Sequence, residues 1–302
     1  MLRIGLIGAD NFHALAFAKL ANLPPEQGGS GLPARVTALW GETPQRAAMV
    51  AREAAIVHIA ASPAELLGQV DAVMVLLRHG GRHCEAALPF LQAGLPVWVD
   101  KPFAIRYDDA LCMVDAARRH GALLDGGSTC KYCPDVLWLR QRYRELAADG
   151  GVISAHLNFP GELDSPYGGL YFYAGHAVEI IITAFGPDIR SVKADVTGGN
   201  VVAVFKYDAF AVSVDFAEVS QYFCTLYSPR GVERRAIDIS TIYRQGFSAF
   251  VNGVLAGRSL NPPAALLLPV RVLNALDSAV QTGREAPVLP VDEAAGAPAA
   301  QA

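Results

Sequence analysis

Cysteine, excess positive charge and long apolar runs are all scarce in this sequence. Five cysteines among 302 residues are too few for the disulfide framework typical of small secreted proteins. Cys130 and Cys133 have the spacing of a metal or redox motif, but no second pair lies near them. We therefore expect reduced thiols and no metal site. A formal net charge of −4 gives no basic surface for nucleic acid or an anionic membrane.

No apolar run approaches the roughly 20 residues that a membrane span requires. The N-terminus enters an apolar strand pattern with no charged leader before it. We expect a cytoplasmic protein that binds neither membranes nor nucleic acid and takes a small molecule as its substrate. With 52% hydrophobic and 18% charged residues, the composition is that of a globular protein, and the length suits two domains.

A short apolar run at residues 97–99 ends at Asp100, Lys101 and Pro102. The run predicts a buried strand of a parallel sheet, and proline ends it because it cannot donate to the ladder. In open α/β sheets, ligands bind beyond the carboxyl ends of the strands. Lys101 is therefore either a candidate for chemistry or a solvated residue at a strand end.

The first 23 residues predict a strand, a tight turn and a helix, which is the context of a dinucleotide-binding fingerprint. In Gly-x-Gly-x-x-Gly terms the three positions are Gly8, Asp10 and His13, so only the first glycine is present. A carboxylate at Asp10 repels phosphate unless it points away, where it could cap the following helix. His13 replaces a packing glycine and could point into the cleft.

The second strand, expected at residues 35–40, ends at Gly41, and Glu42 follows. An acid at this point normally accepts the ribose hydroxyls of NAD. Glu42 reaching the ribose favours NAD, whereas the space at Gly41 favours the 2′-phosphate of NADP. The sequence leaves both cofactors open.

Strands and helices alternate up to about residue 134, and consecutive strands with short links follow. The first pattern predicts a doubly wound parallel sheet, that is, a Rossmann domain. The second predicts an α+β domain with a mostly antiparallel open sheet. We expect a dinucleotide-binding domain at residues 1–127, a substrate-binding and oligomerisation domain at 128–291, and a disordered tail, rich in alanine and proline, at 292–302.

Asp100-Lys101-Pro102 resembles the Glu-Lys-Pro signature of the Gfo/Idh/MocA oxidoreductases, the group of glucose–fructose oxidoreductase and inositol dehydrogenase. Asp100 keeps the charge of that glutamate on a shorter arm. Residues 127–134 resemble the family's G-F-N-R-R-F-x-P crossover segment. The resemblance extends from the N-terminus to this segment.

The family's catalytic histidine lies in a D-x-G-x-H-x-x-D/E pattern, in which His176 and Glu179 match this chain. Phe172 stands where the leading aspartate is expected, and Ala174 replaces the glycine. The loss of the aspartate leaves open what orients His176. Glu179, three residues further along the helix, either holds the imidazole or binds elsewhere.

The resemblance implies an NAD(P)-dependent oxidoreductase that transfers a hydride between nicotinamide and a secondary alcohol or ketone of a sugar or polyol. It implies that Lys101 polarises the hydroxyl and that His176 accepts its proton. The expected substrate-binding residues are Arg78, Lys101, Lys131, Tyr173 and His176. The expected cofactor-binding residues are Gly8, Ala9, Asp10, Asn11, Phe12, His13, Gly41, Glu42, Leu77, Arg78, His79, Asp100, Lys101 and Pro102.

Other functions of the same fold stay open. The eroded fingerprint suits a dinucleotide- or ligand-binding protein without turnover. A tightly bound NAD that is oxidised and reduced within one cycle suits an epimerase or lyase. The family also implies a homodimer or homotetramer that forms through the second sheet.

Overall fold

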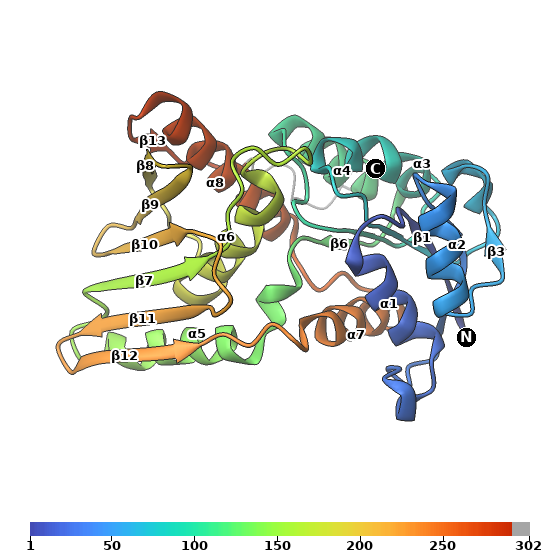
Figure 1. Ribbon diagram of the computed structural model, residues 1–302, viewed down its shortest axis with the longest axis horizontal. Helices are drawn as coiled ribbons and strands as arrows, with labels where there is room; N and C mark the ends of the chain where they lie inside the picture. The colour runs from blue at the N-terminus through green and yellow to red at the C-terminus, as the bar shows by residue number, and fades with distance from the viewer. Residues whose placement is uncertain (292–302) are drawn as a thin grey trace, which may run out of the picture.

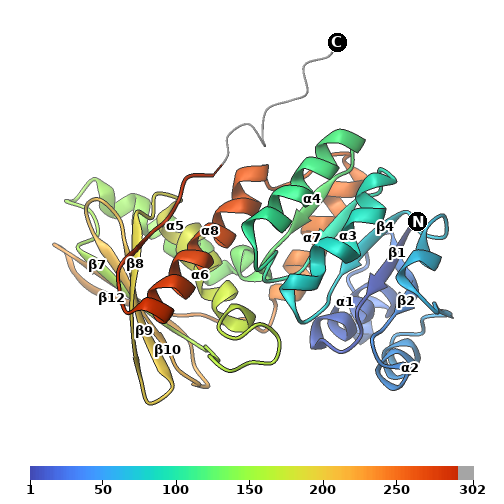
Figure 2. The ribbon, with the colours of Figure 1, turned by 90° about the horizontal axis from the view of Figure 1, so that it is seen from above.

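The structure, a computed structural model, describes residues 1–291. The tail expected at 292–302 lies outside the described residues. Two sheets lie side by side, and helices α6 and α8 run between them (Figures 1 and 2). The predicted combination of a Rossmann sheet with a second, mostly antiparallel sheet is confirmed.

The first sheet is parallel and has the strand order β3-β2-β1-β4-β5-β6. Its strands are β1 (Leu2–Ile7), β2 (Ala34–Trp40), β3 (His58–Ile59), β4 (Ala72–Val75), β5 (Val97–Val99) and β6 (Leu124–Gly126). The helices that follow its strands are α1 (Phe12–Asn22), α2 (Pro44–Glu53), α3 (His83–Gln92) and α4 (Tyr107–His120). All four residues of β4 are buried, because helices cover both faces of a doubly wound sheet. The strand order changes direction between β1 and β4, which places a ligand crevice at their carboxyl ends.

The second sheet is mixed, with the order β12-β11-β7-β10-β9-β8-β13. Its strands are β7 (Ser154–Phe159), β8 (Ser191–Thr197), β9 (Asn200–Lys206), β10 (Ala211–Phe216), β11 (Phe223–Ser228), β12 (Gly231–Ala236) and β13 (Ala286–Pro287). Strands β7 and β10 pair in parallel, whereas the other pairs are antiparallel. Helices α5 (Pro134–Ala147), α6 (Tyr171–Phe185) and α8 (Pro263–Thr282) lie on one face, and the described chain leaves the other face without a helix (Figure 2).

The C-terminal helices return to the first sheet. In α7 (Ile242–Leu255), the ring of Phe247 stacks on Phe17 of α1, and Phe250 meets Trp98 of β5 edge to face. Leu266 and Val270 of α8 join the core of the parallel sheet. A domain boundary at residue 127 stays a prediction, and any such boundary must allow for this return of the chain.

Helix α8 corrects the expectation that no segment is long and apolar enough for a membrane span. Its 20 residues reach a mean hydropathy of 1.3, and half of the apolar window is buried inside the protein. The helix packs against both sheets, so its apolar character is that of a core helix.

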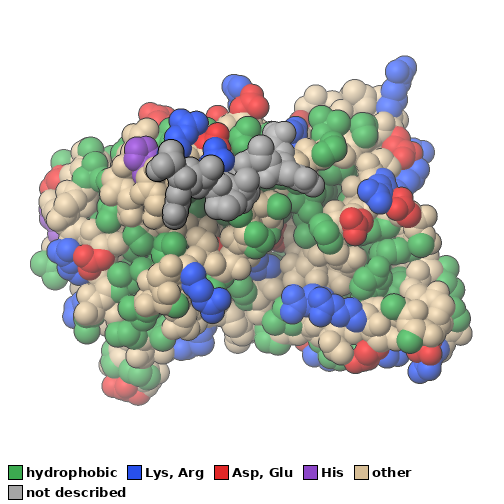
Figure 3. Space-filling model, turned by 180° about the vertical axis from the view of Figure 1, so that it is seen from behind, with side chains coloured by type: hydrophobic (Ala, Val, Ile, Leu, Met, Phe, Trp, Pro, Cys, Tyr) green, Lys and Arg blue, Asp and Glu red, His purple; other side chains and the backbone are tan. Residues whose placement is uncertain are grey.

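On the face seen from behind, acidic and basic side chains are interspersed with apolar ones (Figure 3).

Candidate active site

A cavity of about 320 Å³ lies where the carboxyl ends of the parallel strands meet the second sheet. Arg78 and Lys101 line it from the loops after β4 and β5. Tyr173 and His176 line it from α6, and Tyr243 from α7. Four of the five predicted substrate residues therefore share one cavity.

Lys101 is almost fully buried, with 3% of its surface exposed. Its Nζ donates to the carbonyl oxygen of Phe172 at 2.7 Å and lies 4.2 Å from the centre of the Phe172 ring. Burial lowers the pKa of the Lys101 ammonium to about 8, although the Asp100 carboxylate opposes this shift. Where the family has an aspartate, this chain thus has a ring and a carbonyl that contact the lysine.

Ser128 orients His176. The Ser128 Oγ lies 2.7 Å from Nδ1 of His176 and also accepts the backbone N–H of Cys130 at 3.0 Å. Burial, together with the nearby Lys101 charge, holds the pKa of His176 well below its usual value. The imidazole is therefore neutral at pH 7. No hydrogen bond within residues 1–291 engages its Nε2, and the ring lines the cavity.

Glu179 does not hold the imidazole. Its Oε1 accepts the backbone N–H of Ser128 at 3.1 Å, and its Oε2 lies 3.1 Å from Nζ of Lys131. Burial raises the pKa of Glu179, and the Lys131 charge opposes that shift. Glu179 therefore acts on His176 only indirectly: it holds the backbone of Ser128, and Ser128 contacts the imidazole.

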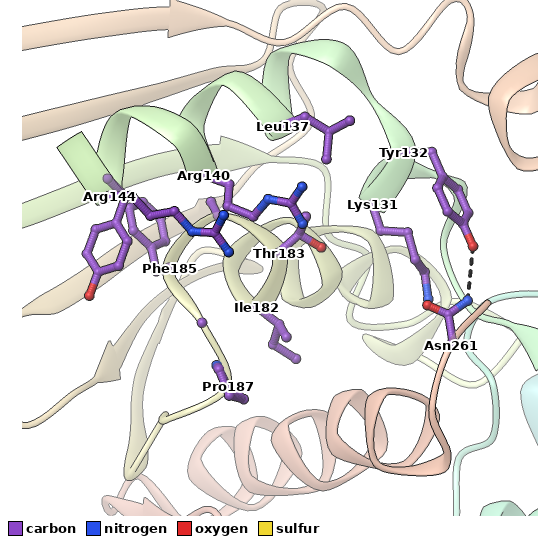
Figure 4. Close-up of a pocket in the computed structure, with 13 residues that line it drawn as sticks. Lys131, Tyr132, Leu137, Arg140, Arg144, Ile182, Thr183, Phe185, Pro187 and Asn261 are labelled. Atoms are coloured by element: carbon purple, nitrogen blue, oxygen red, sulfur yellow. Dashed lines mark hydrogen bonds between the residues drawn. The ribbon is translucent and has the colours of Figure 1, made fainter. Parts of the chain in front are cut away.

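Lys131 lies outside the substrate cavity. Its Nζ donates to the carbonyl oxygen of Gly126 at 2.9 Å and pairs with Glu179. It lines a separate pocket of about 500 Å³ between α5 and α6, together with Arg140 and Arg144 (Figure 4). This geometry does not support the predicted contact between Lys131 and substrate, because the Lys131 ammonium pairs with the buried Glu179 carboxylate.

Asp100 and His13 form a buried pair at the edge of the cavity. The Asp100 Oδ2 lies 2.7 Å from Nδ1 of His13 and accepts from Nδ2 of Asn11 at 3.2 Å. The side chains of Asp100 and His13 are 1% and 7% exposed. Burial alone would raise the pKa of Asp100, but His13 and Lys101 outweigh it, so the net pKa lies below the usual value.

The turn after β1 keeps its first fingerprint glycine for a steric reason. Gly8 has φ 106°, and a Cβ there would lie 2.9 Å from the backbone of Leu76 and Leu77. Asp10 points toward α2, where it accepts the hydroxyl of Thr43 at 2.9 Å. The Asp10 carboxylate is therefore hydrogen-bonded to Thr43 and does not face the backbone amides of its own turn.

The expected cap of α1 comes from a different residue. Asn11, not Asp10, caps the helix, because its Oδ1 accepts the backbone N–H of His13 at 3.2 Å. Phe12 follows at the first position of the helix and is 60% exposed. The start of α1 thus presents a neutral amide cap toward the crevice.

The end of β2 is tightly packed around Gly41. A Cβ at Gly41 would lie 2.6 Å from the Cβ of Ala9. Glu42 forms an ion pair with Arg82, in the turn before α3. Glu42 is thus held by a cation, and its contact with an adenosine ribose stays a prediction.

The remaining predicted cofactor residues lie in the loops after β4 and β5. Leu77 accepts a hydrogen bond from His83 through its carbonyl at 2.8 Å. Arg78 donates to the hydroxyl of Tyr167 at 2.7 Å, which aims it at the cavity. His79 accepts the N–H of Gly81 at 3.1 Å. The peptide bond that joins Lys101 to Pro102 is cis.

These residues fit a nicotinamide dinucleotide. The Gly8 turn brings the chain close to the end of β4, and the start of α1 faces the crevice at the switch point. Asp10, the one acid within the turn, accepts a hydrogen bond from Thr43 and so points away from the crevice. When bound, the dinucleotide would lie along the Gly8–His13 turn with its reactive end toward Lys101.

Comparison with known proteins matches the first domain to a known family. Residues 2–127 match the family described as "Oxidoreductase family, NAD-binding Rossmann fold", the Gfo/Idh/MocA group. Residues 2–127 therefore match the NAD-binding Rossmann domain of this family. The activity of the chain is that of an NAD(P)-dependent oxidoreductase, and its cofactor is NAD or NADP.

Two further relatives cover most of the chain. Inositol 2-dehydrogenase 2 of Saccharopolyspora erythraea is 29% identical over 275 residues, which cover 87% of this chain and 72% of that protein. Scyllo-inositol dehydrogenase of Lactobacillus casei, solved with NAD(H) and scyllo-inositol, has a TM-score of 0.80 at 14% identity and covers 95% and 99% of the two chains.

GenD2 from gentamicin A biosynthesis, solved with NAD, also has a TM-score of 0.80, at 17% identity, and covers 96% and 97% of the two chains. At these low identities the solved structures establish the shared fold.

Sequence reasoning missed Ser128, Tyr222 and Tyr243 as parts of the site. Ser128 was visible as part of the crossover segment, but its contact with a histidine 48 residues away was not. Tyr222 reaches the cavity from the segment just before β11, and Tyr243 reaches it from α7. No local pattern marks them, because tertiary packing alone brings them to the cavity.

Proposed function

We propose that the protein is a dehydrogenase that oxidises a secondary alcohol of a cyclic polyol or sugar, using NAD or NADP. The observation that carries this proposal is the shared cavity of Lys101 and His176 at the carboxyl edge of the parallel sheet. The inositol dehydrogenases among its relatives support the substrate class.

The cavity provides a cation and an imidazole for the substrate hydroxyl. The ammonium of Lys101 stabilises the negative charge that develops on the oxygen as the hydride leaves. His176 binds the same hydroxyl through Nε2, the ring nitrogen that no group within residues 1–291 engages. Bound nicotinamide supplies the hydride acceptor.

The walls of the cavity suit a small, hydroxyl-rich ring. Aromatic side chains of Phe172, Tyr173, Tyr222 and Tyr243 enclose it. Tyrosines combine an apolar ring with a hydroxyl that hydrogen-bonds. A volume of about 320 Å³ is at the low end for small-molecule sites, which suits one sugar-sized ring.

Cofactor binding and turnover test the proposal. Purified protein, checked first for copurified cofactor, is titrated with NAD⁺, NADH, NADP⁺ and NADPH by nicotinamide fluorescence. Polyols and sugars are then screened for formation of reduced cofactor. We expect micromolar binding of one cofactor pair and turnover of a cyclic polyol. An empty protein that binds neither pair would refute the proposal.

The same assay separates the two alternatives. Cofactor binding without turnover of any polyol or sugar would favour a binding protein. Substrate conversion without release of reduced cofactor would favour an epimerase or lyase with tightly bound NAD. The presence of both Lys101 and His176 in one cavity supports the dehydrogenase, because a binding protein needs neither.

We also propose a cytoplasmic homo-oligomer that forms through the helix-free face of the second sheet. This face bears partly exposed apolar side chains, including Val202 and Tyr227, at 47% and 40% exposure. Cell fractionation tests the location, and light scattering tests the assembly.

A further inference from the structure

The cavity holds a second histidine that the proposed mechanism has not used. His13 and His176 both line it, and their ring centres are 6.2 Å apart. We propose that His13, held by Asp100, accepts the substrate proton, while His176 binds the hydroxyl as a neutral imidazole. This inference rests on the proposed dehydrogenase function, and it differs from the sequence-based prediction that His176 accepts the proton.

The partner of each imidazole decides which of its nitrogens carries the proton. Asp100 Oδ2, at 2.7 Å, is an acceptor only. His13 therefore carries its proton on Nδ1, and its Nε2 keeps a lone pair. No hydrogen bond within residues 1–291 engages that Nε2. His13 is thus fixed in the tautomer that a general base requires.

His176 faces a hydroxyl instead of a carboxylate. Ser128 Oγ already accepts the N–H of Cys130, so its own hydrogen is available for Nδ1 of His176. Donation from Ser128 places the histidine's hydrogen on Nε2, toward the cavity. In this tautomer His176 donates to the substrate oxygen and has no lone pair to take its proton.

The charge produced by proton transfer is also better accommodated at His13. A buried imidazolium needs a nearby anion. Asp100 supplies one to His13, in the same way that a carboxylate stabilises the imidazolium of a catalytic triad. Glu179 is turned away from His176 toward Ser128 and Lys131. A proton on His176 would lie near Lys101, and no carboxylate within residues 1–291 hydrogen-bonds to the ring.

Three departures from the family patterns agree with this assignment. Phe172 removes the aspartate expected beside the helix histidine. His13 adds an imidazole where the fingerprint has glycine, and Asp100 replaces a glutamate with a shorter arm. The carboxylate–imidazole pair of this chain thus joins the first turn of α1 to the residue after β5.

The proposed step balances. The substrate C–H bond breaks, and its electron pair leaves as a hydride to the nicotinamide of NAD⁺ or NADP⁺. The substrate O–H bond breaks, and its proton forms a bond to Nε2 of His13. The electron pair of the O–H bond forms the carbonyl. His13 later returns the proton to water.

Activity of position-13 variants tests this assignment. His13→Gly restores the fingerprint glycine, and His13→Gln keeps the side chain's bulk without a base. We expect kcat to fall at least about a hundredfold in both, as for loss of a general base, while His13→Gly binds cofactor no more weakly than the wild type. His120→Gln, at the exposed end of α4, is the control. A folded variant with kcat within tenfold of the wild type would overturn the proposal.

The pH profile tests Asp100 as a positioning residue. The charged or titratable groups around the pair are Lys101, His176 and Tyr243, and His83 lies behind Asp100. Proton transfer to His13 requires a neutral imidazole, so activity should decline at acid pH. Asp100→Asn removes the anion that stabilises the imidazolium, so this acid limb should move to lower pH. An unmoved limb would contradict the role of Asp100.

A spectroscopic measurement on the cofactor-free protein needs no activity. Nitrogen-15 NMR of the imidazoles should show neutral His13 protonated at Nδ1 and His176 protonated at Nε2. A neutral His13 protonated at Nε2 would overturn the proposal, even where no position-13 variant folds. Absence of any turnover by the wild type would instead overturn the proposed function on which this inference rests.

Discussion

Lys101 carries its charge into a site that water barely reaches. Its ammonium is held by the Phe172 carbonyl, the Phe172 ring and the neighbouring Asp100 carboxylate. Lys101→Met removes the ammonium that, in the proposed mechanism, stabilises the developing alkoxide. We expect kcat/KM to fall by about 2–4 kcal/mol of transition-state stabilisation, roughly thirty- to nearly a thousandfold. Steady-state kinetics measure the loss, and a change of only a few-fold would remove Lys101 from the mechanism.

We expect the same residue to set an alkaline limit to activity. Burial lowers the pKa of Lys101 to about 8, so the ammonium that binds the oxygen is lost as pH rises through that value. We expect kcat/KM to decline above about pH 8. Lys101→Arg keeps its charge at higher pH, so the decline should move upward. Equal alkaline limbs in the two proteins would exclude Lys101 as their cause.

At the residue scale, the sequence indicated individual site residues better than it indicated contacts between them. Lys101 stood at a predicted strand end and His176 near the start of a predicted helix, so local patterns marked both. The contact between His13 and Asp100 joins residues 87 positions apart. Whether the buried carboxylate meets a histidine depends on how two loops pack, which no local pattern contains.

At the scale of elements, we expect the turn after β2 to control the choice between NAD and NADP. Glu42 and Arg82 neutralise each other where an adenosine ribose would lie. Glu42→Ala frees the Arg82 guanidinium to bind a 2′-phosphate. We expect the ratio of NADP⁺ to NAD⁺ affinity to rise by about tenfold, or 1.4 kcal/mol. Fluorescence titration measures both affinities, and an unchanged ratio would place the ribose elsewhere.

Behind α6, we expect Lys131 to contribute to stability and not to substrate binding, because its ammonium pairs with Glu179 outside the cavity. Lys131→Met leaves the Glu179 carboxylate buried without its cation. We expect the free energy of unfolding to fall by about 3 kcal/mol, while KM stays close to that of the wild type. Urea denaturation measures the first quantity. Lys19→Met, which breaks an exposed pair with Glu53, should change stability much less. A raised KM with unchanged stability would restore the substrate role predicted from the sequence.

Elements with local start and stop signals could be predicted closely. Helix α4 is such an element, because two acids lie in its first turn and Gly121 ends it at φ 67°. The parallel pairing of β7 with β10 was not predictable in this way. The strands are separated by α6 and two other strands, and only tertiary packing places them side by side.

At the scale of the whole molecule, the C-terminal helices join the two sheets. Phe247 and Phe250 of α7 fill the core of the first sheet, and α8 contributes to the cores of both. The sequence does not indicate which sheet each of these helices covers, because that depends on tertiary packing. The cavity lies between the halves that these helices hold together, since Tyr243 of α7 lines it.

The helix-free face of the second sheet makes a final prediction about assembly. Strand β9 alternates, so that Val201, Ala203 and Phe205 enter the core while Val202 lies 47% exposed on the other face. Such a face, left open in a single chain, is stabilised by burial against a second copy. We expect light scattering to find an oligomer of the 32.1 kDa chain at micromolar concentration. Val202→Lys should shift it toward the monomer because a buried lysine lacks a partner there. Val57→Lys, at a 91% exposed site near the first sheet, should not. A wild-type monomer, or equal assembly of the two variants, would exclude this face as the interface.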